Sequence, residues 1–168
     1  MTSILILGGA RSGKSRHAQA RAEALPGALL YIATGQALDE EMAERIARHR
    51  EDRGPRWRTI AAPFALPEAI EEAAGDEQVL LVDCLTLWLS NLMLAGHDLE
   101  DAAESLADAV GHAPGTVILV ANEVGLGIVP ENALARRFRD AAGRLNQKVA
   151  GCADEVLLVA AGLPLRLK

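Results

Sequence analysis

Residues 8–15 read Gly8-Gly9-Ala10-Arg11-Ser12-Gly13-Lys14-Ser15, near the start of a chain of 168 residues. This stretch matches the phosphate-loop pattern G-x-x-x-x-G-K-[ST] in full, directly after the apolar run 4–7 and at the start of an expected helix. Backbone N–H groups of such a loop curl around phosphate oxygens, and the helix N-terminus adds favourable partial charge. The pattern predicts a bound nucleoside triphosphate, with Lys14 bridging its β- and γ-phosphates and Ser15 binding Mg²⁺. A glycine-rich turn without a ligand is the alternative.

A second apolar segment ends in a carboxylate. Residues 79–82 are apolar and Asp83 follows them, the form of a Walker B segment. Such an acid lies near the phosphate loop and holds Mg²⁺ directly or through water. Many buried strands also end in an aspartate, so the phosphate loop is what favours the metal role.

Short apolar runs alternate with longer amphipathic segments, which is typical of an α/β fold with a largely parallel sheet and helices on both faces. Only Ala161 and Gly162 separate the last two expected strands, which predicts a C-terminal antiparallel hairpin. Segment 53–64 is the most loop-like stretch of the first half, and residues 1–168 form one expected domain. The expected strands are 4–7, 29–33, 79–82, 117–121, 156–160 and 163–167; the expected helices are 14–24, 38–53, 66–74, 86–95, 99–111 and 132–150.

Composition narrows the class of protein. Half the residues are apolar and the formal net charge is -6, which argues against a protein that coats a nucleic-acid backbone. We see no signal peptide and no stretch long enough to span a membrane, so we expect a cytoplasmic protein. Cys84 and Cys152 lie far apart in apolar surroundings, and we expect two buried free thiols rather than a zinc site or a disulfide.

The expected helix over 38–53 carries a histidine near its end. Met42, Ile46 and His49 are spaced by four and three residues, so His49 lies on the inward face. One interpretation is an amphipathic helix with a hydrogen-bonded histidine and solvated arginines. The other makes His49 a nucleophile toward a phosphoryl or nucleotidyl group, with nearby arginines neutralising the phosphates. The spacing does not choose between them.

Further motifs follow the phosphate loop in a fixed order. They are 31–34 (YIAT), 45–53 (RIxxHRxxR), 57–59 (WRT), 82–91 (VDCLTLWLSN), 122–130 (NEVGxGIVP) and 138–147 (FRDxxGxxNQ). Together they span nearly the whole chain. In this combination the chain resembles the bifunctional adenosylcobinamide kinase and adenosylcobinamide-phosphate guanylyltransferase family of cobalamin biosynthesis.

The resemblance implies a RecA-like P-loop fold, a homotrimer and two activities. The first phosphorylates adenosylcobinamide with a nucleoside triphosphate, ATP or GTP; the second transfers GMP from GTP to adenosylcobinamide phosphate through a guanylylated histidine. His49 matches that histidine, with Lys14 as the other catalytic residue and Mg²⁺ on Ser15 and Asp83. The implied nucleotide contacts are Gly8, Gly9, Ala10, Arg11, Ser12, Gly13, Lys14, Ser15, Ala33, Thr34, Gly35, Arg50, Glu51, Asp52, Arg53 and Asp83.

The chain departs from the family pattern after Trp57-Arg58-Thr59-Ile60. The family commonly has an acidic residue where this chain has Ala61, so a carboxylate partner for guanine is missing there; backbone atoms or Glu68 are the candidate replacements. Glu123 follows an expected strand end, where ligands of α/β sheets gather. It either positions the acceptor hydroxyl or forms a structural hydrogen bond.

Two further points stay open. The basic side chains of segment 132–150 form either a solvated face or a contact with corrinoid or a neighbouring subunit: Arg136, Arg137, Arg139, Arg144 and Lys148. Trp57 and Trp88 are expected to be packing anchors. The rival functions are a single-activity kinase of a small metabolite and a regulatory RecA-like nucleotide switch.

Overall fold

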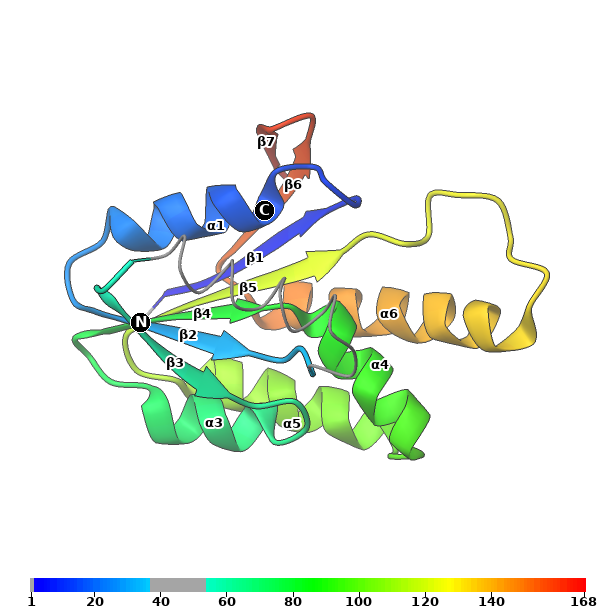
Figure 1. Cartoon of the computed structure of the whole chain (residues 1–168), viewed down its shortest axis with the longest axis horizontal. Helices are drawn as coiled ribbons and strands as arrows, with labels where there is room; N and C mark the ends of the chain where they lie inside the picture. The colour runs from blue at the N-terminus through cyan, green and yellow to red at the C-terminus, as the bar shows by residue number, and fades with distance from the viewer. Residues whose placement is uncertain (1, 37–53) are drawn as a thin grey trace.

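A twisted, mostly parallel sheet forms the centre of the molecule (Figure 1). The computed structural model describes residues 2–36 and 54–168, and within them the strand order is β3-β2-β4-β5-β1-β6-β7. Neighbouring strands run parallel except β6 and β7, which form the predicted antiparallel hairpin. The strands are β1 (Thr2–Gly8), β2 (Ala28–Ala33), β3 (Trp57–Ala61), β4 (Gln78–Asp83), β5 (Thr116–Asn122), β6 (Glu155–Ala160) and β7 (Leu163–Arg166).

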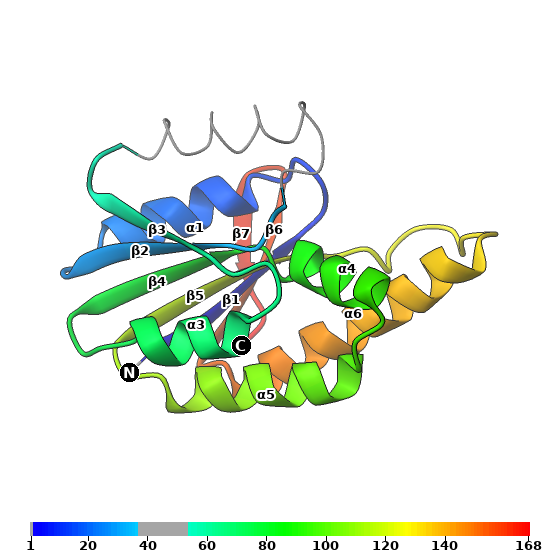
Figure 2. The same ribbon diagram turned by 60° about the horizontal axis from the view of Figure 1, so that its bottom comes forward.

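Helices cover both faces of the sheet. Helix α1 packs on one face, and α3, α4, α5 and α6 pack on the other (Figure 2). The helices lie within a few residues of their predicted bounds: α1 (Lys14–Glu23), α3 (Leu66–Ala73), α4 (Leu85–Ala95), α5 (Leu99–His112) and α6 (Ala133–Cys152). The helix predicted over 38–53 falls outside the described residues.

Local signals fix several helix ends. The Asp98 carboxylate accepts hydrogen bonds from the N–H groups of Glu100 and Asp101 at the start of α5. Asn132 caps α6 in the same way. Gly96 ends α4 in the left-handed conformation, which glycine adopts at little cost.

Two apolar clusters hold the sheet between its helices. The larger one joins the sheet to α3, α4, α5 and α6, and the fully buried Trp88 anchors it as predicted. The smaller one joins α1 to the sheet, and α1 contributes only Ala18 and Ala22 to its buried residues. Central strands are apolar on both faces, because helices exclude water from both.

Strand β3 corrects the prediction of a loop over 53–64. Trp57–Ala61 pairs in parallel with β2, in register from Leu29 opposite Trp57 to Ala33 opposite Ala61. The strand lies at the edge of the sheet and exposes Arg58 and Thr59, so it lacks the apolar run that marks the central strands. Trp57 itself is half-buried: its ring meets Tyr31 edge-on and its indole N–H donates to Glu23.

The cysteine prediction needs a smaller correction. Both thiols are free, but Cys84 is buried whereas Cys152 is only half-buried. Across residues 2–36 and 54–168, every helix is too short or too polar to cross a bilayer.

Candidate nucleotide site

The parallel topology gathers, at one edge of the sheet, the strand ends that carry the described part of the predicted nucleotide site. Register places Gly8 beside Asn122 on β5 and Ala33 beside Asp83 on β4. The carboxyl ends of β1, β2, β4 and β5 therefore share one edge, which is where open α/β sheets bind their ligands.

The phosphate loop joins β1 to α1 in the predicted strand–loop–helix arrangement. Gly13 has a φ of 92° and Arg11 a φ of 55°, so the loop curls through left-handed backbone conformations. A Cβ on Gly8 would lie 2.5 Å from Ser12 Oγ and 2.6 Å from the Val159 carbonyl oxygen. Only glycine fits there. The first α1 hydrogen bond runs from His17 N–H to the Gly13 carbonyl, so the helix N-terminus opens onto the loop.

Lys14 folds back over this loop. Its side chain is buried, and its ammonium donates to the Gly9 carbonyl oxygen at 3.1 Å. Burying a cation is costly unless strong acceptors surround it. A loop carbonyl is a modest partner for an ammonium, whereas a phosphate oxygen is a strong one. The arrangement holds a positive charge ready at the loop.

Asp83 ends β4, one strand beyond β5 from the phosphate loop. It is half-buried. Burial of the neighbouring Cys84 thiol, and then the negative charge of Asp83, raise the pKa of that thiol. Ser15 is half-buried in the first turn of α1. A hydroxyl and a carboxylate are hard oxygen donors, and Mg²⁺ takes its remaining ligands from water and phosphate. The donor set fits Mg²⁺, while the described residues contain no cluster of three His, Cys, Asp or Glu side chains for a metal held by protein alone.

Thr34 follows β2 and is fully buried. Its hydroxyl is committed to the backbone of Cys84, and its carbonyl accepts a hydrogen bond from the Asn91 amide. The same amide reaches the Pro63 carbonyl. The Thr34 side chain therefore supports the rim of the site rather than facing solvent.

Glu123 follows β5 beside the phosphate loop. Its backbone N–H donates to the Gly8 carbonyl oxygen at 3.0 Å, and its carboxylate accepts from the Gly125 N–H. Glu123 therefore forms the structural hydrogen bond that was one of its two predicted roles. Asn122 is held in turn by the Thr86 hydroxyl.

Of the remaining candidate residues, Gly35, Ala61 and Glu68 are described and the others lie in the segment outside the described residues. Ala61 ends β3 beside Ala33, exposed, and Glu68 is exposed in the first turn of α3. His49 and the segment 50–53 (Arg50, Glu51, Asp52, Arg53) lie outside the described residues.

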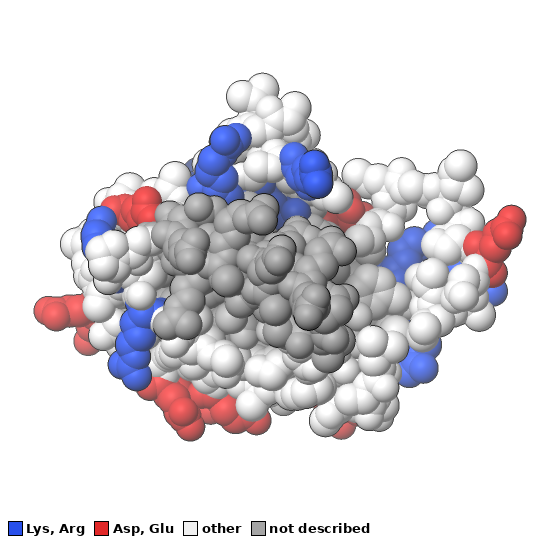
Figure 3. Space-filling view, viewed as in Figure 1, with Lys and Arg blue, Asp and Glu red and all other residues white. Residues whose placement is uncertain are grey.

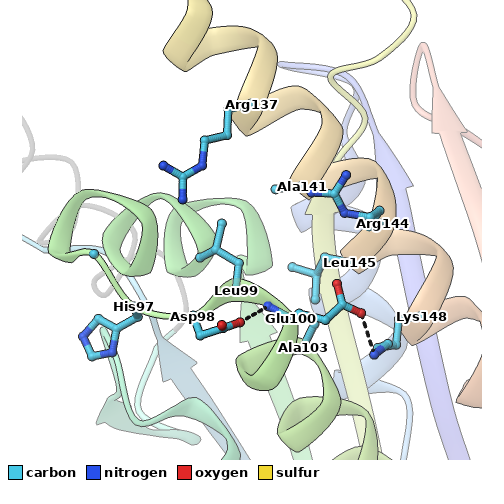
Figure 4. A pocket seen from close by; sticks show the side chains of 11 residues that line it. His97, Asp98, Leu99, Glu100, Ala103, Arg137, Ala141, Arg144, Leu145 and Lys148 are labelled. Carbon is cyan, nitrogen blue, oxygen red and sulfur yellow. Dashed lines mark hydrogen bonds and ion pairs between the residues drawn. The ribbon is translucent and has the colours of Figure 1, made fainter.

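The basic residues of α6 mostly have partners. Lys148 forms ion pairs with Glu100 and Glu104 of α5, and Arg139 pairs with Asp140. Arg136 donates to two carbonyls just before the helix. Arg137 and Arg144, with Lys148, line a cavity of about 460 Å³ between α6 and the α4–α5 turn (Figure 4). On the face shown in Figure 3, acidic and basic side chains are interspersed around the described surface without a continuous basic stripe.

Comparison with known proteins gives a family match. A family model described as "Cobinamide kinase / cobinamide phosphate guanyltransferase" matches residues 4–167. A "Bifunctional adenosylcobalamin biosynthesis protein CobP" from Pseudomonas aeruginosa is 49% identical over 166 residues, covering 98% of this chain and 96% of that protein. Proteins named "Bifunctional adenosylcobalamin biosynthesis protein CobU" from Salmonella typhimurium and Escherichia coli are 44% and 46% identical, each covering 98% of this chain and 99% of the relative.

Solved structures agree on the fold. A Pyrococcus horikoshii protein from a structural study matches with a TM-score of 0.59 at 8% identity, covering 99% of this chain and 86% of that one. An ATPase of a bacterial type III secretion system matches with a TM-score of 0.57 at 10% identity, covering 98% and 56%. These similarities confirm the RecA-like P-loop fold.

Proposed function

The chain belongs to the cobinamide kinase / cobinamide phosphate guanyltransferase family, and we propose that it performs both of the reactions in that name. It phosphorylates adenosylcobinamide with a nucleoside triphosphate, and it then transfers GMP from GTP to adenosylcobinamide phosphate with release of pyrophosphate. The observation that carries the proposal is a complete phosphate loop with a buried lysine in a chain that the family matches over residues 4–167.

In the kinase step, the substrate hydroxyl attacks the γ-phosphorus and the bond to the β-phosphate oxygen breaks. Backbone N–H groups of Gly8–Ser15 and the ammonium of Lys14 stabilise the charge that spreads over the phosphate oxygens. The hydroxyl loses its proton to water as it attacks. Mg²⁺ bound through Ser15 and Asp83 would supply further neutralisation of the phosphate charge.

In the transferase step, an imidazole nitrogen of His49 attacks the α-phosphorus of GTP and pyrophosphate leaves. A phosphate oxygen of adenosylcobinamide phosphate then attacks the same phosphorus, the nitrogen–phosphorus bond breaks, and neutral His49 is restored. Splitting one hard displacement into two is the advantage of a covalent intermediate. Arg50 and Arg53 neutralise the phosphates in this scheme, with Ala33, Thr34, Gly35, Glu51 and Asp52 completing the nucleotide contacts.

We further propose that residues 1–168 act as one catalytic domain in the cytoplasm and assemble as a homotrimer. An exposed apolar arm supports self-association. Residues 124–134 carry Leu126 and Ile128, which are 86% and 97% exposed, and the arm with the start of α6 projects from the rest of the molecule (Figures 1 and 2). Apolar surface of this kind marks protein–protein contacts.

The transferase is tested by incubating the chain with Mg²⁺ and GTP labelled on the α-phosphate. We expect label on the protein that is labile to acid and stable to alkali, and that adenosylcobinamide phosphate removes. His49→Ala should carry no label. The labelling rate should fall at low pH, because a protonated imidazole has no free lone pair for attack.

A parallel assay separates the two activities. With ATP labelled on the γ-phosphate, His49→Ala should still phosphorylate adenosylcobinamide, which shows that the variant folds. Wild-type protein that phosphorylates adenosylcobinamide but never acquires GMP would instead indicate the single-activity kinase. Nucleotide binding without turnover of either substrate would indicate the regulatory switch.

A further inference from the structure

The tip of the β6–β7 hairpin touches the phosphate loop. The Gly162 N–H donates to the Ser12 carbonyl oxygen at 2.8 Å, although the two residues are 150 positions apart. A Cβ on Gly13 would lie 3.3 Å from Gly162 Cα, so the two glycine backbones are in close contact. Ala161 and Gly162 both have positive φ, 51° and 81°, as a tight two-residue hairpin turn requires.

This contact is the main restraint on the Ser12 carbonyl. Within the described residues, Ser12 Oγ is buried and has no hydrogen-bond partner, so the side chain does not anchor the residue. The Ser12 N–H forms a hydrogen bond inside the loop, to Gly9 at 3.2 Å. The Gly162 N–H is thus the group outside the loop that fixes the peptide bond between Ser12 and Gly13.

Peptide geometry gives this contact a consequence for ligand binding. A trans peptide is planar, so its C=O and N–H point in opposite directions. Holding the Ser12 carbonyl toward the hairpin therefore turns the Gly13 N–H away from the hairpin. Among the described residues, none accepts a hydrogen bond from that N–H. The group is left as a donor of the loop, which is the kind of donor that binds phosphate oxygen.

We propose that Gly162 is a positioning residue for the phosphate loop: the hairpin tip orients the Gly13 N–H toward the phosphates of the bound nucleotide. Glycine suits position 162 because it adopts positive φ without strain, and the close approach of the two backbones is what requires glycine at position 13. The inference rests on the nucleotide-binding part of the proposed function and not on either reaction of the corrinoid.

The test is the affinity for MgATP of Gly162→Val, measured by calorimetric titration. A β-branched residue at positive φ strains the turn and displaces the N–H. We expect the Kd for MgATP to rise by about tenfold, equivalent to about 1.4 kcal/mol. Gly162→Asn tolerates the left-handed conformation and should restore the affinity to within about threefold of wild type.

Gly96 provides a matched control. It has a φ of 78° at the end of α4, and a Cβ there, as at Gly162, would meet nothing within 4 Å. Gly96→Val should therefore introduce similar backbone strain while leaving the Kd for MgATP within about twofold of wild type. Equal losses in Gly96→Val and Gly162→Val would overturn the proposal, because they would trace to strain alone. Wild-type affinity in Gly162→Val would overturn it as well.

Two more readouts complete the test. If Gly162→Val does not fold, Gly162→Ala replaces it, with an expected loss of about threefold, and an unchanged Kd contradicts the positioning role. In steady-state phosphorylation, the KM for ATP should rise in the Gly162 variants while the KM for adenosylcobinamide stays constant. Because MgATP binding needs no corrinoid, absence of corrinoid turnover would refute the proposed function without touching this result.

Discussion

Thr34 and Cys84 are joined by two hydrogen bonds through a single hydroxyl. Thr34 Oγ1 donates to the Cys84 carbonyl oxygen at 2.7 Å and accepts from the Cys84 N–H at 2.9 Å. The two residues are the first after β2 and β4, so this hydroxyl ties the ends of neighbouring strands together. Asp83 lies directly before Cys84, and its backbone is thereby held at the edge of the sheet.

Replacing this hydroxyl should lower the free energy of unfolding. Thr34→Val keeps the shape of the side chain but leaves the buried N–H of Cys84 without its partner, whereas the Cys84 carbonyl keeps the hydrogen bond from the Trp88 N–H. We expect a loss of about 1–3 kcal/mol in the free energy of unfolding, measured by urea denaturation. Thr34→Ser retains the hydroxyl and should lose much less. Equal losses in the two variants would assign the effect to the methyl group instead.

Removing the Lys14 charge should impair phosphate binding more than folding. Lys14→Met keeps most of the side-chain length, and we expect kcat/KM for corrinoid phosphorylation to fall by about a hundredfold or more. The free energy of unfolding should change little, since within residues 2–36 and 54–168 the ammonium donates a hydrogen bond to the Gly9 carbonyl alone. Lys148→Met, made in the α5–α6 ion pairs, is the matched control and should keep full activity. A comparable loss there would contradict a specific role for Lys14.

Asp154 should make the free energy of unfolding depend on pH. The Ser3 backbone N–H, and then the Ser3 hydroxyl, hold the pKa of the Asp154 carboxyl below its ordinary value. Folding therefore gains from ionised Asp154 above the unfolded pKa of about 3.9, and the gain is lost as pH falls through the lower folded pKa. In urea denaturation at pH 7, wild type should have a larger free energy of unfolding than Asp154→Asn, and this difference should shrink toward pH 3. A difference that is constant with pH would contradict this assignment.

The exposed arm should control assembly. Ile128→Asp places a charge where self-association would bury an almost fully exposed apolar side chain. By light scattering, we expect wild type to have a mass three times the 17.8 kDa of one chain. The mass of Ile128→Asp should fall toward that of one chain. Leu94→Asp, on an α4 side chain that is 70% exposed, is the control and should leave the mass unchanged. If Ile128→Asp keeps the wild-type mass, the arm is not the contact.

The central part of the fold could be predicted because each central strand is a short apolar run and the phosphate loop has a fixed context. The edge strand β3 could not, since Arg58 and Thr59 face solvent and each residue of β3 pairs with one 28 positions earlier in β2. Its aromatic and β-branched residues, Trp57, Thr59 and Ile60, were the available signal. The neighbouring Gly54, Pro55 and Pro63, which are typical of loops, outweighed that signal.

The candidate site, too, could be predicted from the sequence only in part. Residues 8–15 and Asp83 could be placed at one edge from sequence, because parallel strand ends converge there. The support from Gly162 and Asn91 could not, since hydrogen bonds across 150 and 57 residues leave no local pattern. His49 stays a prediction from family resemblance, since it lies outside the described residues.

Helix α1 meets the sheet through two alanines, and this has a consequence for how long the folded chain survives in a cell. Methyl groups bury little area, so apolar side chains hold the helix weakly, and polar contacts of Arg21 with Glu155 and of Glu23 with Trp57 add to them. The helix is therefore expected to open early. A triphosphate bound at its first turn would then stabilise the docked helix, and this stabilisation would rise with the concentration of free nucleotide. Starvation for nucleotide should expose this segment to proteases, which would link the abundance of the protein to the energy state of its host.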